Sequence, residues 1–413
     1  MSLINLLSKS NLVRIRFTFW GLLYLGTSFE IDYYVSECIV RTYSNWLIII
    51  RLIVLYLIFI FSKDNLNLFL MNCLGLNIFL FFFTSNIFIF YIIFEFGLVP
   101  IIILILMRGY QPERIGASLW FVLYTIFGSL PLLIVLIYRF LNFHSTRILL
   151  IRSIGPELII FPFVIGFLVK LPVYGLHLWL PKAHVQAPVT GRIFLAAIIL
   201  KMGGFGVFFI KPLLESTNYW SVLIIRFSVI GSILAMGFCL ILDDLKIVIA
   251  YRRIGHIGLV VGTILRDNEI GLWRSLLIIV GHGFTRSLIF YLGNDMYVVS
   301  GTRRLAITKG LIITSSVLIL FTGLVLILNI SFPPSINVFG EIRAILRMVK
   351  IFPSSVGILI ILVLLGGIFN IALYTKVSHG RNPRMIPSFK IRRKSITTRV
   401  SHFTPYLLLP FMF

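Results

Sequence analysis

The stretch FPFVIGFLVKLPVYGLHLWLPKAHVQAPVTGRIFLAAIILKMGGFGVFFI, residues 161–210, determines the fold class. Its apolar runs are long enough for membrane helices, yet Lys170 ends the first run and Lys201 lies near the middle of the last. Pro172 follows Lys170 closely, and a proline inside an apolar segment removes helix hydrogen bonds and interrupts the helix. The stretch is therefore typical of a membrane helix bundle that contains a broken helix.

The composition of the whole chain agrees with this interpretation. Hydrophobic residues make up 59% of the 413 residues, charged residues make up 12%, and the mean hydropathy is +1.03. A soluble domain of this length needs a larger polar share to cover its surface. The alternating pattern of an outer-membrane barrel is missing, so a helical bundle remains as the way to satisfy the backbone in lipid. The predicted fold class is all-α, a polytopic transmembrane bundle.

About thirteen apolar segments, many near the ~20 residues that cross a bilayer, are predicted to be membrane helices. They lie near 11–28, 46–62, 66–84, 86–107, 115–140, 157–180, 190–212, 220–242, 245–265, 270–293, 308–330, 336–350 and 354–376, with an incomplete tail at 402–413. A second break is expected where Phe332-Pro333-Pro334 precedes Gly340-Glu341. An ordinary loop between two spans is the alternative there.

Several other functions are excluded or disfavoured. The net charge of +23 would suit a nucleic-acid partner, but the basic residues are scattered among apolar segments, and the densest cluster, 390–394, is interpreted as a membrane-flanking loop. The three cysteines Cys38, Cys73 and Cys239 lie far apart without CxxC spacing, which excludes a self-contained iron–sulfur or zinc site. The first residues lack an Arg- and Ser-rich leader, so no cleaved signal is expected.

Ionisable residues recur inside or beside the apolar segments. Such a group at the bilayer centre costs ~2.5–3.5 kcal/mol even on the lenient insertion scale, so it tends to face the bundle interior, pair or contact water. A lone histidine there is more often a satisfied core residue, but acid, lysine and histidine on different central helices favour a function. Burial favours a neutral lysine and a nearby carboxylate favours its ammonium form, so neighbours can switch its protonation state. The six candidates are Glu95, Lys170, Lys201, His256, His282 and Glu341.

Several motifs resemble one known family in sequence and order. LVKLPVYGLHLWLPKAHVQAPVTG at 168–191 is similar to the signature of the antiporter-like subunits of respiratory complex I. The matching motifs elsewhere are FEFGLVP (94–100), QPERIGASLWFVLYTIFGSLPLLIVLIY (111–138), LKMGGFG (200–206), DDLKIVIAY (243–251), GHGFTRSLIFYLGN (281–294) and FPPSINVFGEI (332–342). The resemblance fits the chain 4 group better than the chain 2 and chain 5 groups.

The resemblance implies a fold, a location and partners. The fold would hold two inverted five-helix repeats, within a chain divided into N-terminal membrane helices (1–85), an antiporter-like proton-translocating core (86–376) and a C-terminal loop with a short apolar tail (377–413). The chain would lie in the mitochondrial inner membrane, in the lipid bilayer, with chains 2 and 5 as neighbours. FMN, iron–sulfur clusters and ubiquinone would be bound by other subunits, whose NADH oxidation and ubiquinone reduction drive this chain. No cofactor, metal or nucleic acid is expected on it.

The resemblance also implies a role for each candidate residue. Glu95 matches the acidic partner of the first half, and Lys170 the broken-helix lysine that pairs with it. Lys201 matches the central lysine. His256 and His282 match the histidines that link the two halves. Glu341 matches the terminal acid of the second broken helix, so the six residues would form a proton pathway along the membrane midplane.

The sequence departs from the family pattern in two ways. Gln186 stands where the family has a glutamate, which removes a carboxylate. Four arginines stand where the family has serine: Arg192, Arg252, Arg253 and Arg286. We interpret these as AGA or AGG codons that an invertebrate-type mitochondrial code reads as serine. An arginine-rich lineage with compensating acids on partner subunits is the alternative.

Two other functions compete with the complex I interpretation. A cation/proton antiporter of the multisubunit bacterial type would share the two-repeat core but lack redox coupling. A purely structural subunit with an inactive axis is the weaker alternative, because the set of acid, lysine and histidine is complete. The fit of 281–294 and 332–342 to the chain 4 group favours complex I.

Overall fold

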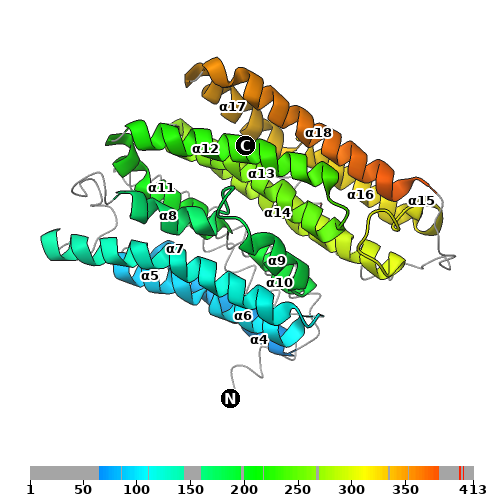
Figure 1. The fold of residues 1–413 in the computed structure, drawn as a ribbon, viewed down its shortest axis with the longest axis horizontal. Helices are drawn as coiled ribbons and strands as arrows, with labels where there is room; N and C mark the ends of the chain where they lie inside the picture. Colours follow the sequence, from blue (N-terminus) through cyan, green and yellow to red (C-terminus); the bar gives the residue numbers. More distant parts are fainter. Residues whose placement is uncertain are drawn as a thin grey trace, which may run out of the picture.

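A computed structural model describes residues 65–84, 86–109, 111–143, 160–196, 200–216, 218–266, 269–333, 335–351 and 353–380, together with residues 400 and 403. Throughout this part of the chain the regular elements are helices (Figure 1). The spans predicted at 11–28 and 46–62 lie outside the described residues, as does nearly all of the 402–413 tail.

The helices follow one another with short connections. The first group comprises α4 (Asn65–Phe83), α5 (Ile87–Phe96), α6 (Val99–Arg108), α7 (Arg114–Phe143), α8 (Ile160–Lys170), α9 (Trp179–Gln186) and α10 (Val189–Phe194). The second comprises α11 (Leu200–Ser216), α12 (Asn218–Ile241), α13 (Leu245–Arg266), α14 (Glu269–Ser300), α15 (Leu311–Thr314), α16 (Ser316–Asn329), α17 (Ile336–Ile351) and α18 (Val356–Ser378). Within the described residues, five spans are long and apolar enough to cross a bilayer: 87–108, 114–142, 219–241, 245–265 and 356–378.

The first predicted break lies between α8 and α9. The span expected over 157–180 is helical only to Lys170, because Pro172 cannot donate the next backbone hydrogen bond. Trp179, the first residue of α9, donates its indole N–H to the carbonyl oxygen of Val169 at 3.0 Å. Gly175, in the gap, has a φ of +94°, a conformation that glycine adopts without a Cβ clash. The gap is therefore an ordered connection that uses a carbonyl left free at the end of α8.

Other predicted spans are also interrupted. The 86–107 span divides into α5 and α6 at Gly97-Leu98, and the 308–330 span divides at Ser315. The second expected break is present between α16 and α17, and Ser331 in it has a φ of 65°. After α10, Leu195 and Ala196 form a π turn, a wider turn that often marks a functional site.

The helices are arranged side by side in an elongated bundle, with α4 to α7 along one side and α16 to α18 along the other (Figure 1). The candidate residues of the central helices α8, α11, α13 and α14 lie between these flanks. Glycines allow the closest approaches: a Cβ on Gly206 would lie 2.0 Å from the ring of Phe167, and one on Gly281 would lie 2.0 Å from Asn337. The outer faces carry many exposed leucine, isoleucine and phenylalanine side chains, as lipid contact requires.

Candidate functional site

Glu95 and Lys170 form a buried ion pair, as the resemblance implied. Lys170 Nζ lies 3.1 Å from Glu95 Oε1, and the Lys170 side chain is 3% exposed. The lysine also donates to the carbonyl oxygen of Phe94, next to its acidic partner. Because α8 ends at Lys170, the side chain leaves the helix where the backbone turns away and can reach α5. The broken helix thus positions the cation of the pair.

Lys201 lies one turn beyond the π turn and is 8% exposed. Its ammonium nitrogen donates to the carbonyl oxygen of Ala196 at 3.0 Å, and no described carboxylate forms an ion pair with it. A lysine nitrogen that donates to a neutral carbonyl holds its position without a fixed counter-charge among the described residues. The protonation state of Lys201 is therefore sensitive to charges that move nearby.

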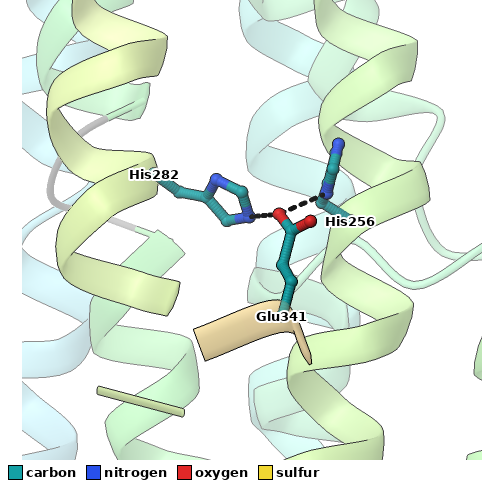
Figure 2. Close-up of side chains that lie close together, drawn as sticks. All are labelled: His256, His282 and Glu341. Carbon is teal, nitrogen blue, oxygen red and sulfur yellow. Dashed lines mark ion pairs between the residues drawn. The ribbon is translucent and has the colours of Figure 1, made fainter. Parts of the chain in front are cut away.

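His256, His282 and Glu341 converge from α13, α14 and α17 (Figure 2). Glu341 Oε1 lies 3.5 Å from His256 Nδ1 and 3.8 Å from His282 Nε2. The two imidazole rings are 4.8 Å apart between centroids and lie nearly edge to face. Glu341 reaches the histidines because α17 begins after the second break and packs against α14. Residues 85 positions apart in the chain thus meet at one point.

A cavity of about 40 Å³ lies beside Lys201 and the two histidines. Its lining residues are Leu171, Leu200, Lys201, Arg253, His256, Ile257, Val260, Ile279, His282 and Arg286. A space of ~10–15 Å³ on this measure holds one water, so the cavity has room for about three. Lys201, His256 and His282 line the cavity, and Lys170 directly precedes the lining residue Leu171. Glu341 contacts both lining histidines, and Glu95, the sixth candidate, pairs with Lys170.

Sequence reasoning missed two buried contacts of this region. His184, fully buried on α9, has its Nε2 2.8 Å from Arg253 Nη1. Arg252 donates to the carbonyl oxygen of Asn329, the last residue of α16, at 2.8 Å. Both contacts join segments about 70 residues apart or more, so no spacing in the sequence could have revealed them.

Gln186 lies at the end of α9 in a polar cluster. Its amide Nε2 donates to Glu113 Oε2 at 2.9 Å and to Gln111 Oε1 at 3.1 Å, while Arg303 Nη1 donates to Gln111 Oε1 at 2.9 Å. An acid at position 186 would instead face the Glu113 carboxylate directly. The glutamine therefore replaces a like-charge contact with a hydrogen bond.

Comparison with known proteins places this architecture in a family. The family model described as NADH:quinone oxidoreductase/Mrp antiporter, TM, matches residues 84–369. NADH-ubiquinone oxidoreductase chain 4 of Lumbricus terrestris is 34% identical over 368 residues, which cover 84% of this chain and 78% of that protein. Chain 4 of Ceratitis capitata is 37% identical over 76% of this chain and 72% of its own length. This chain belongs to the NADH-ubiquinone oxidoreductase chain 4 family.

Solved structures agree with the fold of a chain 4 protein. A chain of respiratory complex I from Thermus thermophilus with bound NADH superposes with a TM-score of 0.77 at 19% identity, over 89% of this chain and 80% of that one. A chain of the Mrp complex from Dietzia sp. superposes with a TM-score of 0.80 at 14% identity and the same coverage. The chain is a multi-pass protein of the mitochondrial inner membrane and a proton-translocating subunit of the membrane arm of complex I.

Proposed function

We propose that protons move through this chain 4 protein along an axis of Glu95, Lys170, Lys201, His256, His282 and Glu341. The observation that carries the proposal is the cavity whose lining includes Lys201 and both histidines. Lys170, which pairs with Glu95, directly precedes the lining residue Leu171, and Glu341 contacts the two lining histidines. Two inverted five-helix repeats, each with a broken helix, would supply the two halves.

The chemistry of the axis follows from the partners of each lysine. Glu95 at 3.1 Å favours the ammonium form of Lys170, so separation of the pair favours release of its proton into the cavity. Lys201 has the neutral Ala196 carbonyl as its hydrogen-bond partner and can accept that proton through water in the cavity. The histidines then offer ring nitrogens to pass it towards Glu341. The charge on one residue of the axis therefore shifts the protonation equilibrium of the next residue.

The remaining parts of the proposal concern the complex. We place chains 2 and 5 of the membrane arm as neighbours, with Glu341 towards one of them. NADH oxidation and ubiquinone reduction, with FMN and iron–sulfur clusters, are assigned to other subunits. The catalytic contribution of this chain is then proton transfer alone, driven electrostatically from outside it.

Substitution of Glu95 tests the electrostatic control of Lys170. Glu95→Gln keeps the side-chain volume but removes the charge, so the complex should assemble and turn over slowly. Glu95→Asp keeps the charge on a shorter side chain and should lose less activity. Rotenone-sensitive NADH:ubiquinone turnover and proton pumping are measured together in assembled complex.

Glu113→Gln is the matched control, because Glu113 is a hydrogen-bonded acid at the polar cluster outside the axis. Its activity should stay near that of the parent. Parent-like turnover and pumping in the Glu95→Gln complex would refute the electrostatic role of the carboxylate.

A further inference from the structure

Lys170 has a partner besides its carboxylate, the aromatic ring of Phe94. The ammonium nitrogen lies over this ring, 3.1 Å from the ring centroid, and it is equally close to Glu95 Oε1. It also donates to the backbone carbonyl oxygen of Phe94. An ammonium group carries three N–H donors, and the carboxylate, the carbonyl and the ring face offer one partner for each. A single residue, Phe94, therefore supplies two of these three partners.

Aromatic neighbours hold the Phe94 ring in place. The side chain is 1% exposed. Its ring contacts those of Phe81 on α4, Phe90 on α5 and Phe167 on α8, at centroid distances of 5.9, 6.2 and 5.2 Å. Phe167 lies one turn before Lys170 on the same helix, so the packing that fixes the ring also fixes it relative to the lysine. A ring held in this way stays beside the ammonium group when the carboxylate moves.

The two side-chain partners of Lys170 differ in their access to water. The Glu95 side chain is 22% exposed, whereas the Lys170 side chain is 3% exposed. Water can compete for the carboxylate, but it cannot reach a ring buried as deeply as that of Phe94. The quadrupole of an aromatic ring attracts a cation, and the attraction is stronger where the cation is desolvated. The ring therefore favours the ammonium form of Lys170 independently of Glu95.

We propose that Phe94 is a positioning residue for proton transfer, whose ring keeps Lys170 in the ammonium form while its contact with Glu95 opens. Without the ring, burial would favour the neutral amine as soon as the carboxylate moved away. With the ring, Lys170 keeps its proton until a charge change in the adjoining cavity draws it on. The proposal rests on the proposed function, in which Lys170 carries a proton.

The other ionisable groups around Lys170 do not replace the ring. On α5, Tyr91 lies close to the Glu95 carboxylate and acts through it. On α11, which packs against α8, Lys201 donates to the Ala196 carbonyl. The described part of α7, which also packs against α8, forms no ion pair with Lys170. Glu95 and the Phe94 ring are thus the two side chains that favour its ammonium form.

The pH dependence of pumping tests the role of the ring. Phe94→Leu removes the ring face but keeps a buried apolar side chain, the backbone carbonyl and Glu95. Because the ammonium form loses a stabilising contact, Lys170 should give up its proton at a lower pH. The alkaline limb of rotenone-sensitive turnover and pumping in assembled complex should therefore move to lower pH by about one unit. Phe94→Tyr keeps the ring face and should retain the parent profile.

Phe90→Leu is the matched control, because Phe90 lies one turn earlier on α5, is buried and contacts the Phe94 ring. It removes a ring from the same aromatic cluster and should leave the alkaline limb in place. Equal shifts in Phe90→Leu and Phe94→Leu would assign the effect to packing and overturn the proposal. A parent profile in the Phe94→Leu complex would also overturn it. Phe94→Met, with a more adaptable apolar side chain, gives the same comparison if Phe94→Leu does not assemble.

Lys170→Ala separates failure of this proposal from failure of the axis. Parent-like pumping by the Lys170→Ala complex would contradict the axis, and with it the role of Phe94. Loss of pumping in Lys170→Ala, together with a parent-like pH profile in Phe94→Leu, would overturn the role of the ring alone.

Discussion

Peptide mass spectrometry across residues 247–260 is expected to show serine at positions 252 and 253, where the sequence reads arginine. The structure strengthens the physical case for this result. Arg192, Arg252, Arg253 and Arg286 are 1–3% exposed, and all four lie in helices of the bundle interior. The side chain of an arginine within a membrane segment usually extends to the membrane interface, pairs with a carboxylate or contacts water.

The contacts of the adjacent pair are with neutral groups. Arg252 contacts the Asn329 carbonyl, His256 and the ring of Phe369, whereas Arg253 contacts His184 and the ring of Phe290. Nε and Nη2 of Arg253 have no hydrogen-bond partner. These contacts satisfy single donors, and neither guanidinium belongs to an ion pair among the described residues; Glu341 is the carboxylate that acts on Arg252 from a longer distance.

Charged arginines inside a membrane are energetically costly. Each charged arginine inside the membrane costs ~2.5–3.5 kcal/mol on the insertion scale, so four cost on the order of 10–14 kcal/mol. That is comparable to the whole stability of a typical domain, ~5–15 kcal/mol. Serine at these positions removes the cost and also lets helices approach closely.

A tryptic digest distinguishes serine from arginine at positions 252 and 253. If the codons are AGA or AGG read as serine, trypsin leaves one uncleaved peptide across 247–260, with Ser-Ser in place of the arginine pair. Lys182, an exposed lysine on α9, is the positive control for cleavage in the same digest. Cleavage after residue 252 or 253 would show real arginines and favour compensating acids on partner subunits.

Hydropathy and residue type predicted much of this architecture. Apolar segments indicate membrane helices because the backbone must form all its hydrogen bonds internally in lipid. Pro172 predicted the end of α8 because proline has no backbone N–H to donate to the next helix hydrogen bond. The pair of Glu95 with Lys170 was implied by resemblance and is present at 3.1 Å. The functional roles of these residues stay predictions.

Other features depend on helix rotation, which no local pattern encodes. The approach of Glu341 to both histidines is set by how α17 packs against α14 after the second break. The π turn at Leu195-Ala196, which frees a carbonyl for Lys201, also lacks a sequence signal. The 157–180 span was predicted too long because its apolar residues continue past Lys170, while the backbone does not stay helical. Packing decides these points, and packing joins residues distant in the chain.

Lys201→Ala is expected to give a complex that assembles but hardly pumps. The amine of Lys201 makes a single hydrogen bond among the described residues, to the Ala196 carbonyl, so its loss removes little from stability. Its loss also removes the only lysine in the cavity lining and with it the proton acceptor between the Glu95–Lys170 pair and the histidines. A tenfold fall in rate needs only about 1.4 kcal/mol on the barrier, and the loss of a relay group should exceed that.

Lys309→Ala, at an exposed lysine outside the axis, is the matched control and should leave turnover unchanged. Lys201→Arg keeps a cation that cannot readily give up its proton, so it should fail as Lys201→Ala does.

The most direct measurement is therefore that of the rates of NADH oxidation and of proton pumping, taken together on reconstituted complex carrying Lys201→Ala. The proton axis predicts turnover and pumping reduced to about a tenth of the parent or less, with the subunit composition of the parent complex. Full pumping by an assembled Lys201→Ala complex would contradict it.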